Sequence, residues 1–302
     1  MGMTSYDLSV LHYLKEKGHI PHHQSVMEIG AQQLANNFLA AEDLLVKTSE
    51  LFKTTTPHNF PKVVPSELAH GSLVAQSSVA PSARDFWQWI GFKHAAIDID
   101  ESPGSIALDL NFDGIKRKHR GKFALVTNMG TTEHIANQHN AFKVIHELTA
   151  QHGVMYHNVP SQGMMNHGLI NYNLKFFWML ARSNGYEWLF ANYLNSAEYY
   201  GLPQNIIDQC SPYNAAIIDH ANIYRVADAS IVVALKKTFD IPFVSPLDVP
   251  TGTGTTNKLT RKRYWSVLTE NAFENLIDKK ALQQRSITRR VIRKLRSLMM
   301  PG

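Results

Sequence analysis

The chain has 302 residues, 44% hydrophobic and 18% charged, a mixture that supplies a core and excludes disorder over most of its length. Its single cysteine, Cys210, excludes an internal disulfide, and no apolar run reaches the roughly 18 residues that cross a bilayer; we expect a soluble, cytoplasmic protein. The net charge of +5 belongs to the C-terminal part, where 12 Lys and Arg face three acids from Lys258 onward. The preceding part is slightly acidic, so we expect no nucleic-acid partner.

The first third of the chain predicts helices around one short strand. Apolar spacing predicts a helix within Met3–Gly18 and another over Gln33–Phe52, separated by the strand Ser25–Ile29. Lys53–Pro81 is rich in Thr, Pro and Ser and predicts an irregular excursion. Ser82–Ile90 then predicts a helix capped by its own first serine and ended by a glycine.

Short apolar runs alternate with helices from residue 92 onward. Four predicted strands end in polar residues, and they are His94–Ile99, Ser105–Leu110, Phe123–Asn128 and Val154–Asn158. Predicted helices cover Asn137–Ala150 and Leu174–Asn184, and Ser230–Leu235 with Phe239–Val244 predicts a late antiparallel pair. This alternation favours a parallel sheet with helices on both faces, where ligands bind beyond the carboxyl ends of the strands.

Acidic residues stand at three successive strand ends. Glu28-Ile29-Gly30 closes the first strand, where a glycine lets the backbone approach a ligand and a carboxylate accepts hydrogen bonds. Asp98 closes the next strand, at the place for a ribose diol, and Asp109 closes the third, where it can bind an adenine amine. The dinucleotide fingerprint needs two further glycines, which are missing here, so an NAD-dependent sugar-modifying enzyme is disfavoured.

This order of residues resembles the class I S-adenosylmethionine-dependent methyltransferases, in particular their small-molecule group. The best match is Phe123–Ile135, an apolar strand followed by a loop with a Glu-His-apolar triplet. The resemblance covers roughly Ser25 to Val249. It implies a doubly wound, mostly parallel α/β sheet of seven strands with helices on both faces, the Rossmann-like methyltransferase fold. We expect this domain over residues 1–250, with an insertion around 39–91, and a basic helical extension over 251–302.

The resemblance also implies a cofactor, S-adenosyl-L-methionine, and the residues that bind it. These are Glu28, Gly30, Ala31, Gln32, Asp98, Ile99, Asp109, Leu110, Asn128 and Met129. Two features depart from the family. The first motif has one glycine where members often have three, so its loop is either wider or sealed by Gln32. Asp98 lies 68 positions after Gly30, where about 20 are usual, which is the reason for the predicted insertion.

Methyl transfer to a hydroxyl also needs a group that takes a proton. The candidates near the ends of the fourth and fifth strands are His134, His157, His167 and Glu133, with His167 preferred because it lies in a glycine-flanked loop. Their spacing resembles no compact metal motif, so we predict no metal site, although a divalent ion beside the cofactor stays an alternative.

The sequence therefore predicts a methyltransferase acting on an oxygen or nitrogen of a small metabolite or glycan-related substrate. The alternative is a catalytically degenerate member that binds a nucleoside or a partner. In the tail, Arg285–Met299 places Ile287, Val291, Leu295 and Leu298 on one helical face among basic residues. Such a helix can dock on the body or a partner, which we favour, or rest weakly on an anionic membrane surface. The sequence does not fix the oligomeric state.

Overall fold

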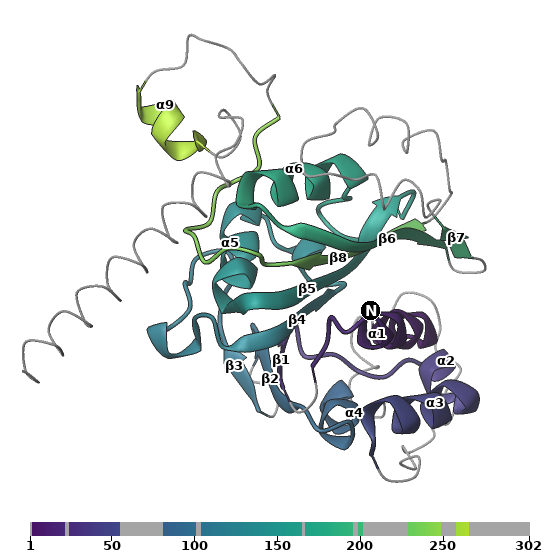
Figure 1. The fold of residues 1–302 in the computed structure, drawn as a ribbon. Helices are drawn as coiled ribbons and strands as arrows, with labels where there is room; N and C mark the ends of the chain where they lie inside the picture. Colours follow the sequence, from purple (N-terminus) through teal and green to yellow (C-terminus); the bar gives the residue numbers. More distant parts are fainter. Residues whose placement is uncertain are drawn as a thin grey trace, which may run out of the picture. The chain divides into compact units, whose positions relative to one another are not determined.

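The computed structural model describes residues 2–21, 24–54, 81–100, 104–164, 167–195, 199–201, 229–248 and 258–265 (Figure 1). The helices are α1 (Ser5–Glu16), α2 (Asn36–Leu39), α3 (Glu42–Phe52), α4 (Ala83–Trp89), α5 (Gln138–Leu148), α6 (Leu174–Asn184) and α9 (Lys258–Arg263), with 3-10 turns η1 (Arg117–His119) and η2 (Thr132–His134). The strands are β1 (Ser25–Ile29), β2 (Lys93–Asp98), β3 (Ser105–Ala107), β4 (Phe123–Met129), β5 (Thr149–Gln162), β6 (Glu187–Asn195), β7 (Tyr199–Gly201) and β8 (Ala229–Lys236).

All eight strands form one sheet, in the order β3-β2-β1-β4-β5-β8-β6-β7. The pairs from β3 to β5 are parallel, whereas β8 runs antiparallel to both β5 and β6. The predicted doubly wound, mostly parallel sheet is thus confirmed, with the three-residue strand β7 added at the edge to the seven strands expected. The order reverses between β1 and β4, and such a switch point opens a crevice at the carboxyl ends of the strands.

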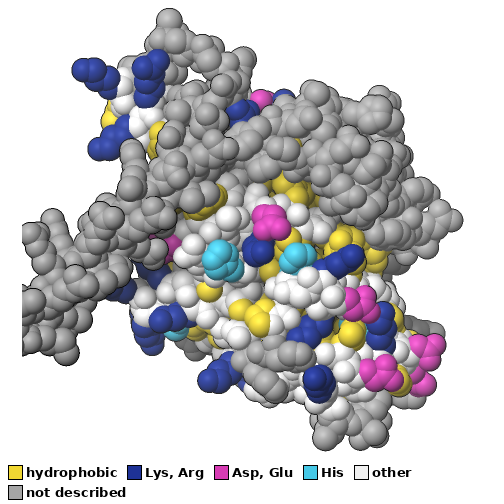
Figure 2. All heavy atoms as spheres, viewed as in Figure 1, with side chains coloured by type: hydrophobic (Ala, Val, Ile, Leu, Met, Phe, Trp, Pro, Cys, Tyr) yellow, Lys and Arg dark blue, Asp and Glu magenta, His cyan; other side chains and the backbone are white. Residues whose placement is uncertain are grey.

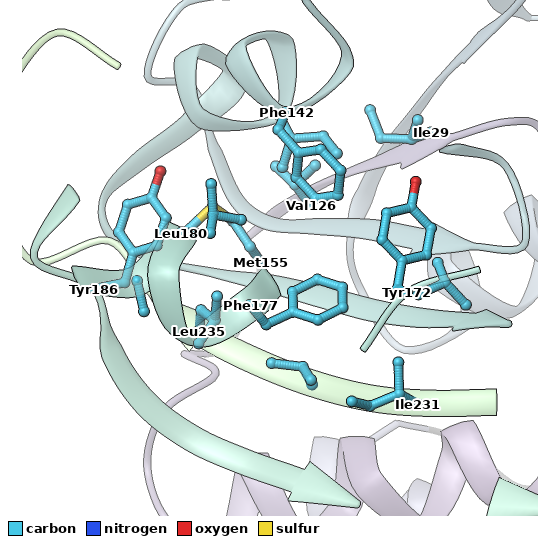
Figure 3. Close-up of a cluster of buried hydrophobic side chains, with 14 of the residues drawn as sticks. Ile29, Val126, Phe142, Met155, Tyr172, Phe177, Leu180, Tyr186, Ile231 and Leu235 are labelled. Carbon is cyan, nitrogen blue, oxygen red and sulfur yellow. The ribbon is translucent and has the colours of Figure 1, made fainter. Parts of the chain in front are cut away.

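Helices cover both faces of the sheet (Figure 1). Since side chains alternate along a strand, Met27 and Ile29 of β1 join the core under α5 and α6, whereas Val26 joins the core under α1 to α4. Figure 3 shows the first of these cores, where Phe142 of α5 and Phe177 of α6 lie over the strands. The pleat therefore decides which helical layer each strand residue contacts.

The predicted helix ends have clear local causes. Helix α1 begins with a capping box, in which the Thr4 hydroxyl accepts from the Asp7 N–H and the Asp7 carboxylate accepts from the Thr4 N–H at 2.8 Å. The same Asp7 is 2% exposed, and its second oxygen accepts hydrogen bonds from the hydroxyl of Tyr156 and from Nδ2 of Asn158, at 2.8 Å for the amide. One side chain thus caps α1 and attaches it to β5.

The chain leaves the sheet after β1 and returns to the same place. The N–H of Leu34 donates to the carbonyl of Pro81 at 2.8 Å, and Gln33 bridges Ser82. Helix α4, which starts at Ala83 with Ser82 as its cap, then leads directly into β2. Helices α2 and α3 thus belong to a long segment whose two ends lie side by side, and α4 is the crossover helix itself.

Several predicted elements differ in the structure. The predicted strand Ser105–Leu110 ends at Ala107, and the predicted helix Asn137–Ala150 ends at Leu148, where β5 begins. Phe239–Val244 forms no strand, and the antiparallel neighbours of β8 are β5 and β6. The expected helix Gln33–Phe52 is two helices, α2 and α3, interrupted at Ala40 and Ala41.

Contacts divide the chain into two units, residues 1–245 and 246–302. In the second unit the structure describes α9, whose Arg261, Lys262 and Arg263 are exposed. The predicted helix Arg285–Met299 and much of the predicted excursion lie outside the described residues. Among the described helices, none has the length and hydropathy of a membrane span. On the face shown in Figure 2, described acidic, basic and histidine side chains are interspersed.

Candidate functional site

A cavity of about 410 Å³ lies at the carboxyl ends of β1, β2, β3 and β4, at the switch point of the sheet. Its volume is in the range of small-molecule sites. The residues that line it follow the four strands in order, and they are Gly30, Ala31, Gln32, Ile97, Asp98, Ile99, Leu108, Asp109, Leu110, Asn111, Gly130, Thr131, His134 and Ile135. Seven of the ten predicted cofactor-binding residues are among them.

The turn after β1 requires a glycine at position 30. Its φ is +80°, and a Cβ atom there would lie 2.3 Å from Oγ1 of Thr131, the residue that follows β4 by two positions. The Thr131 hydroxyl donates to the carbonyl of Ile29 at 2.6 Å, so a hydrogen bond joins the loop after β4 to the end of β1. The glycine of Glu28-Ile29-Gly30 is therefore required by the backbone conformation and by the close contact with Thr131. The sequence did not predict the contact with Thr131.

Gln32 seals the single-glycine turn. Its side chain is 6% exposed, and Nε2 donates to the carbonyl of Gly30 at 3.3 Å and contacts Oγ1 of Thr131 at 3.5 Å. The other side-chain atom, Oε1, is buried and accepts no hydrogen bond from a described residue. Gln32 is one of the residues that line the cavity, and its buried Oε1 keeps the capacity to accept a hydrogen bond.

Asp98 is fixed at the tip of β2. One carboxylate oxygen accepts from the N–H of Ala31 at 2.8 Å and the other from the N–H of Ile99 at 2.7 Å. Because a carboxylate has about four acceptor positions, it can still accept from a diol in the cavity. Ile99 follows directly, 72% exposed, and with Leu108 and Leu110 it gives this end of the cavity an apolar wall. Asp109 lies between those two leucines, and one of its oxygens accepts from the N–H of Asn111.

Glu28 does not line the cavity. It shares its strand face with Val26 and is 1% exposed, with Oε1 accepting from Nε1 of Trp87 at 2.8 Å and Oε2 at 3.0 Å from Nε2 of His94. Oε2 also accepts from the N–H of Gln32 at 3.2 Å. The predicted cofactor contact is corrected: the pleat turns Glu28 towards α4, and it can act on the cavity only by positioning Gln32.

Asn128 and Met129 also lie behind the cavity wall. Asn128 is fully buried, with Nδ2 donating to Oγ1 of Thr132 at 2.8 Å and Oδ1 accepting from the N–H of the same residue. Met129 belongs to the core under α1 to α4. Both side chains hold the loop after β4 in place, and neither offers a polar atom to a ligand in the cavity.

Three of the four predicted proton-handling residues come together. Glu133 is fully buried, and its Oε1 lies 3.4 Å from Nε2 of His167 and 3.8 Å from Nε2 of His134. The His134 side chain is 49% exposed and lines the cavity, and the two imidazole centroids are 5.6 Å apart. We call these three residues the glutamate–histidine cluster. It lies at the β4 end of the cavity, three strands from the Asp109 end.

His157 is separate from this cluster. It is 1% exposed and packs against Phe142 and Phe177, with ring centroids 5.6 and 5.1 Å away. Burial alone lowers the pKa of His157 to about 3. The structure therefore corrects the interpretation of His157 as a base for substrate, because its imidazole belongs to the core and does not line the cavity.

A hydrogen-bond network supports the loop that carries Glu133. The Tyr172 hydroxyl donates to Gln138, and Nε2 of Gln138 donates to the carbonyl of Thr132 at 2.7 Å. Burial raises the pKa of the Tyr172 hydroxyl, so it stays a neutral donor. The sequence did not predict this network, nor the roles of Thr131 and Gly168. The only sequence signals for the last two are that Thr131 follows the end of a predicted strand and that Gly168 follows His167.

The strand order and the cavity at the switch point define an α/β protein with the Rossmann-like methyltransferase fold. No protein-family model and no curated protein matches the chain. Among solved structures it is similar to the 1,6-didemethyltoxoflavin-N1-methyltransferase of Burkholderia thailandensis, with 11% identity, TM-score 0.39, and coverage of 77% of this chain and 76% of that one.

Two further similar structures are a geranyl diphosphate methyltransferase in complex with SAM (9% identity, TM-score 0.41, covering 76% of this chain and 85% of that one) and a SAM-dependent methyltransferase of Archaeoglobus fulgidus (8%, 0.38, 76% and 94%). Similarity at TM-scores of 0.38 to 0.41 does not indicate an activity. The fold is assigned from the strand order.

Proposed function

We propose that the protein is an S-adenosyl-L-methionine-dependent methyltransferase that acts on an oxygen or nitrogen of a small metabolite or glycan-related substrate. The observation that carries the proposal is the cavity at the switch point. Its polar groups at the β1 and β2 ends match the cofactor, and the glutamate–histidine cluster lies at its β4 end.

The residues present fit this cofactor part by part. Gly30 leaves room where a Cβ would fill the turn, and the unpaired Oε1 of Gln32 suits the ammonium of the methionine part. Asp98 suits the ribose diol. The exposed Ile99, with the leucines around Asp109, suits a flat aromatic base.

The cofactor, when bound, supplies an electrophilic methyl group on a sulfonium. An acceptor hydroxyl or amine would have to lose its proton in this transfer. The chain's part is to align the acceptor opposite the carbon–sulfur bond and to give the proton a way out. The candidates to take that proton are His167, which we prefer, and His134, whose half-exposed side chain lines the cavity.

Calorimetry with S-adenosylmethionine and S-adenosylhomocysteine tests the proposal. Both should bind one per chain, and methylated product should form from at least one acceptor in a panel of hydroxylated and amine-bearing metabolites. Well-folded protein that binds neither compound would overturn it.

A degenerate nucleoside-binding or interaction protein on the same fold is the second candidate. It is favoured by one observation, the buried Gln32 that closes the turn after β1. Tight cofactor binding without turnover over the whole panel would support this candidate.

A further inference from the structure

The buried carboxylate of Glu133 accepts no hydrogen bond from the part of the chain that the structure describes. The side chain is fully buried, and this holds for both of its oxygens. Burying a carboxylate in this way is costly unless a cation or donors compensate for it. The nearest candidates, Nε2 of His167 and Nε2 of His134, are 3.4 and 3.8 Å from Oε1, longer than an N–H···O bond of about 2.7–3.2 Å.

Those distances are close to the separations between ligands of one metal ion. Metal–ligand bonds of 2.0–2.2 Å in a tetrahedral site place the ligand atoms about 3.3–3.6 Å apart. The Glu133–His167 separation of 3.4 Å falls within this range, and the ligand atoms of all three residues lie within 4.8 Å of one another. The largest adjustment falls on His134, whose side chain is 49% exposed.

The backbone around Glu133 holds the carboxylate in position. The N–H groups of Leu169 and Ile170 donate to the Glu133 carbonyl at 2.8 and 3.1 Å, which brings the loop of His167 against η2. At Gly168, a Cβ atom would lie 2.8 Å from Cγ of Glu133, so only glycine lets the loop come this close. His167 is therefore presented to Glu133 by a tightly packed turn.

We propose that Glu133, His134 and His167 bind a divalent transition-metal ion, with zinc as the best fit. Two imidazoles and one carboxylate suit zinc and its neighbours, whereas magnesium and calcium prefer oxygen ligands alone. Three protein ligands leave the fourth position open, as in catalytic zinc sites. Since His134 lines the cavity, an ion held by these three residues would lie beside it, and it would favour an oxygen-bearing acceptor as a further ligand, which rests on the proposed function.

Metal binding by the 302-residue chain tests this proposal. The chain is stripped with a chelator and then titrated with Zn²⁺ without S-adenosylmethionine. Calorimetry should give one Zn²⁺ per chain, and Co²⁺ should give the intense visible absorption of a four-coordinate ion. Each of the three ligand variants should weaken Zn²⁺ binding at least about 100-fold, and they are Glu133→Gln, His134→Gln and His167→Gln. Loss of a residue that only supports a ligand typically costs about 10- to 100-fold.

His152→Asn is the matched control, because His152 is exposed and stands at the opposite, amino-terminal end of β5. Its φ of +66° is one that asparagine tolerates. It should bind Zn²⁺ as the intact chain does. His134→Gln changes a half-exposed side chain and keeps the test readable if a buried variant fails to fold.

No uptake by the intact chain, or a Zn²⁺ affinity that survives Glu133→Gln, would overturn the proposal. An equal loss of Zn²⁺ affinity in His152→Asn and in the cluster variants would also overturn it, because Zn²⁺ would then be binding to histidines scattered over the surface. Because no cofactor is present in the titration, the result does not depend on whether the chain transfers methyl groups.

Discussion

Asp98 joins the first two strands at their tips, because its Oδ2 accepts a hydrogen bond from the backbone N–H of Ala31 at 2.8 Å. One carboxylate thus shapes the turn after β1 and borders the cavity. A change at this residue alters the loop and the ligand contact together, and it gives the first prediction.

Asp98→Ala should weaken binding of S-adenosylhomocysteine by about 1–3 kcal/mol, roughly 5- to 150-fold, since the ribose hydroxyls lose their charged acceptor. Calorimetry on folded protein measures this. Asp100→Ala is the paired variant: if it weakens binding and Asp98→Ala does not, the ribose acceptor is Asp100.

Gly30→Ala should lower stability more than Gly18→Ala, measured by chemical denaturation. Both glycines have φ near +80°, a conformation that costs an alanine about 1–2 kcal/mol, but only at Gly30 would the Cβ meet another residue, Thr131. Cofactor binding should be lost in Gly30→Ala alone. Equal effects of the two variants on both properties would show that the contact with Thr131 is unimportant.

His167→Ala should reduce turnover by about 10²–10⁴-fold and leave cofactor affinity nearly unchanged, if the cluster serves the acceptor. His157→Ala should instead reduce stability, since it opens a void between Phe142 and Phe177. Steady-state kinetics and melting curves for both variants separate the two roles. Loss of turnover in well-folded His157→Ala with none in His167→Ala would reverse the assignment.

Stability should fall as the pH drops from about 6.5, because burial lowers the pKa of His157 to about 3 and those of His12 and His146 to about 4. Below pH 6.5 the unfolded chain binds protons that the folded chain refuses, so protonation favours unfolding until the pH passes the folded pKa. His157→Phe should reduce the loss between pH 7.5 and 5 by about 2 kcal/mol, measured by denaturant titration. An unchanged pH dependence would mean that His157 has the same pKa in the folded and the unfolded chain.

Deleting residues 285–302 tests the basic tail. If the tail rests on membranes, the intact chain should sediment with anionic vesicles at low salt and be released at high salt, and the deletion should not sediment. If the apolar stripe docks on the body, the deletion should melt at a lower temperature and neither form should bind vesicles. Unchanged melting and vesicle binding after deletion would contradict both interpretations.

Strand positions could be predicted because they depend on local pattern. Ser25–Ile29 has the predicted bounds, and Gly30, Asp98 and Asp109 meet at one cavity since parallel strands end at the same edge. The prediction of a strand over Phe239–Val244 was wrong. Pro242 lies within this segment, and proline has no N–H to donate to a neighbouring strand. Asn184 binds this segment instead, through both the N–H and the carbonyl of Val244.

The direction in which the side chains near the strand ends point could not be predicted from the sequence. Glu28 and His157 were assigned to ligand contacts by their position near a strand end, but the pleat turns each into a helical layer. Which layer covers which face depends on Trp87 and Phe177, more than 50 and 15 residues away, and no local pattern contains that information. The meeting of Glu133 with His167 likewise depends on a turn whose shape only the packing at Gly168 defines.

Helix α1 is synthesised early but can be completed only late. The donors that satisfy its buried Asp7, Tyr156 and Asn158, lie 149 and 151 residues further along the chain. A ribosome adding about 5–20 residues per second needs roughly 8–30 s to produce them. During that interval the Asp7 oxygen that faces β5 has no protein partner, so the first helix made must wait for the fifth strand before it takes its final place.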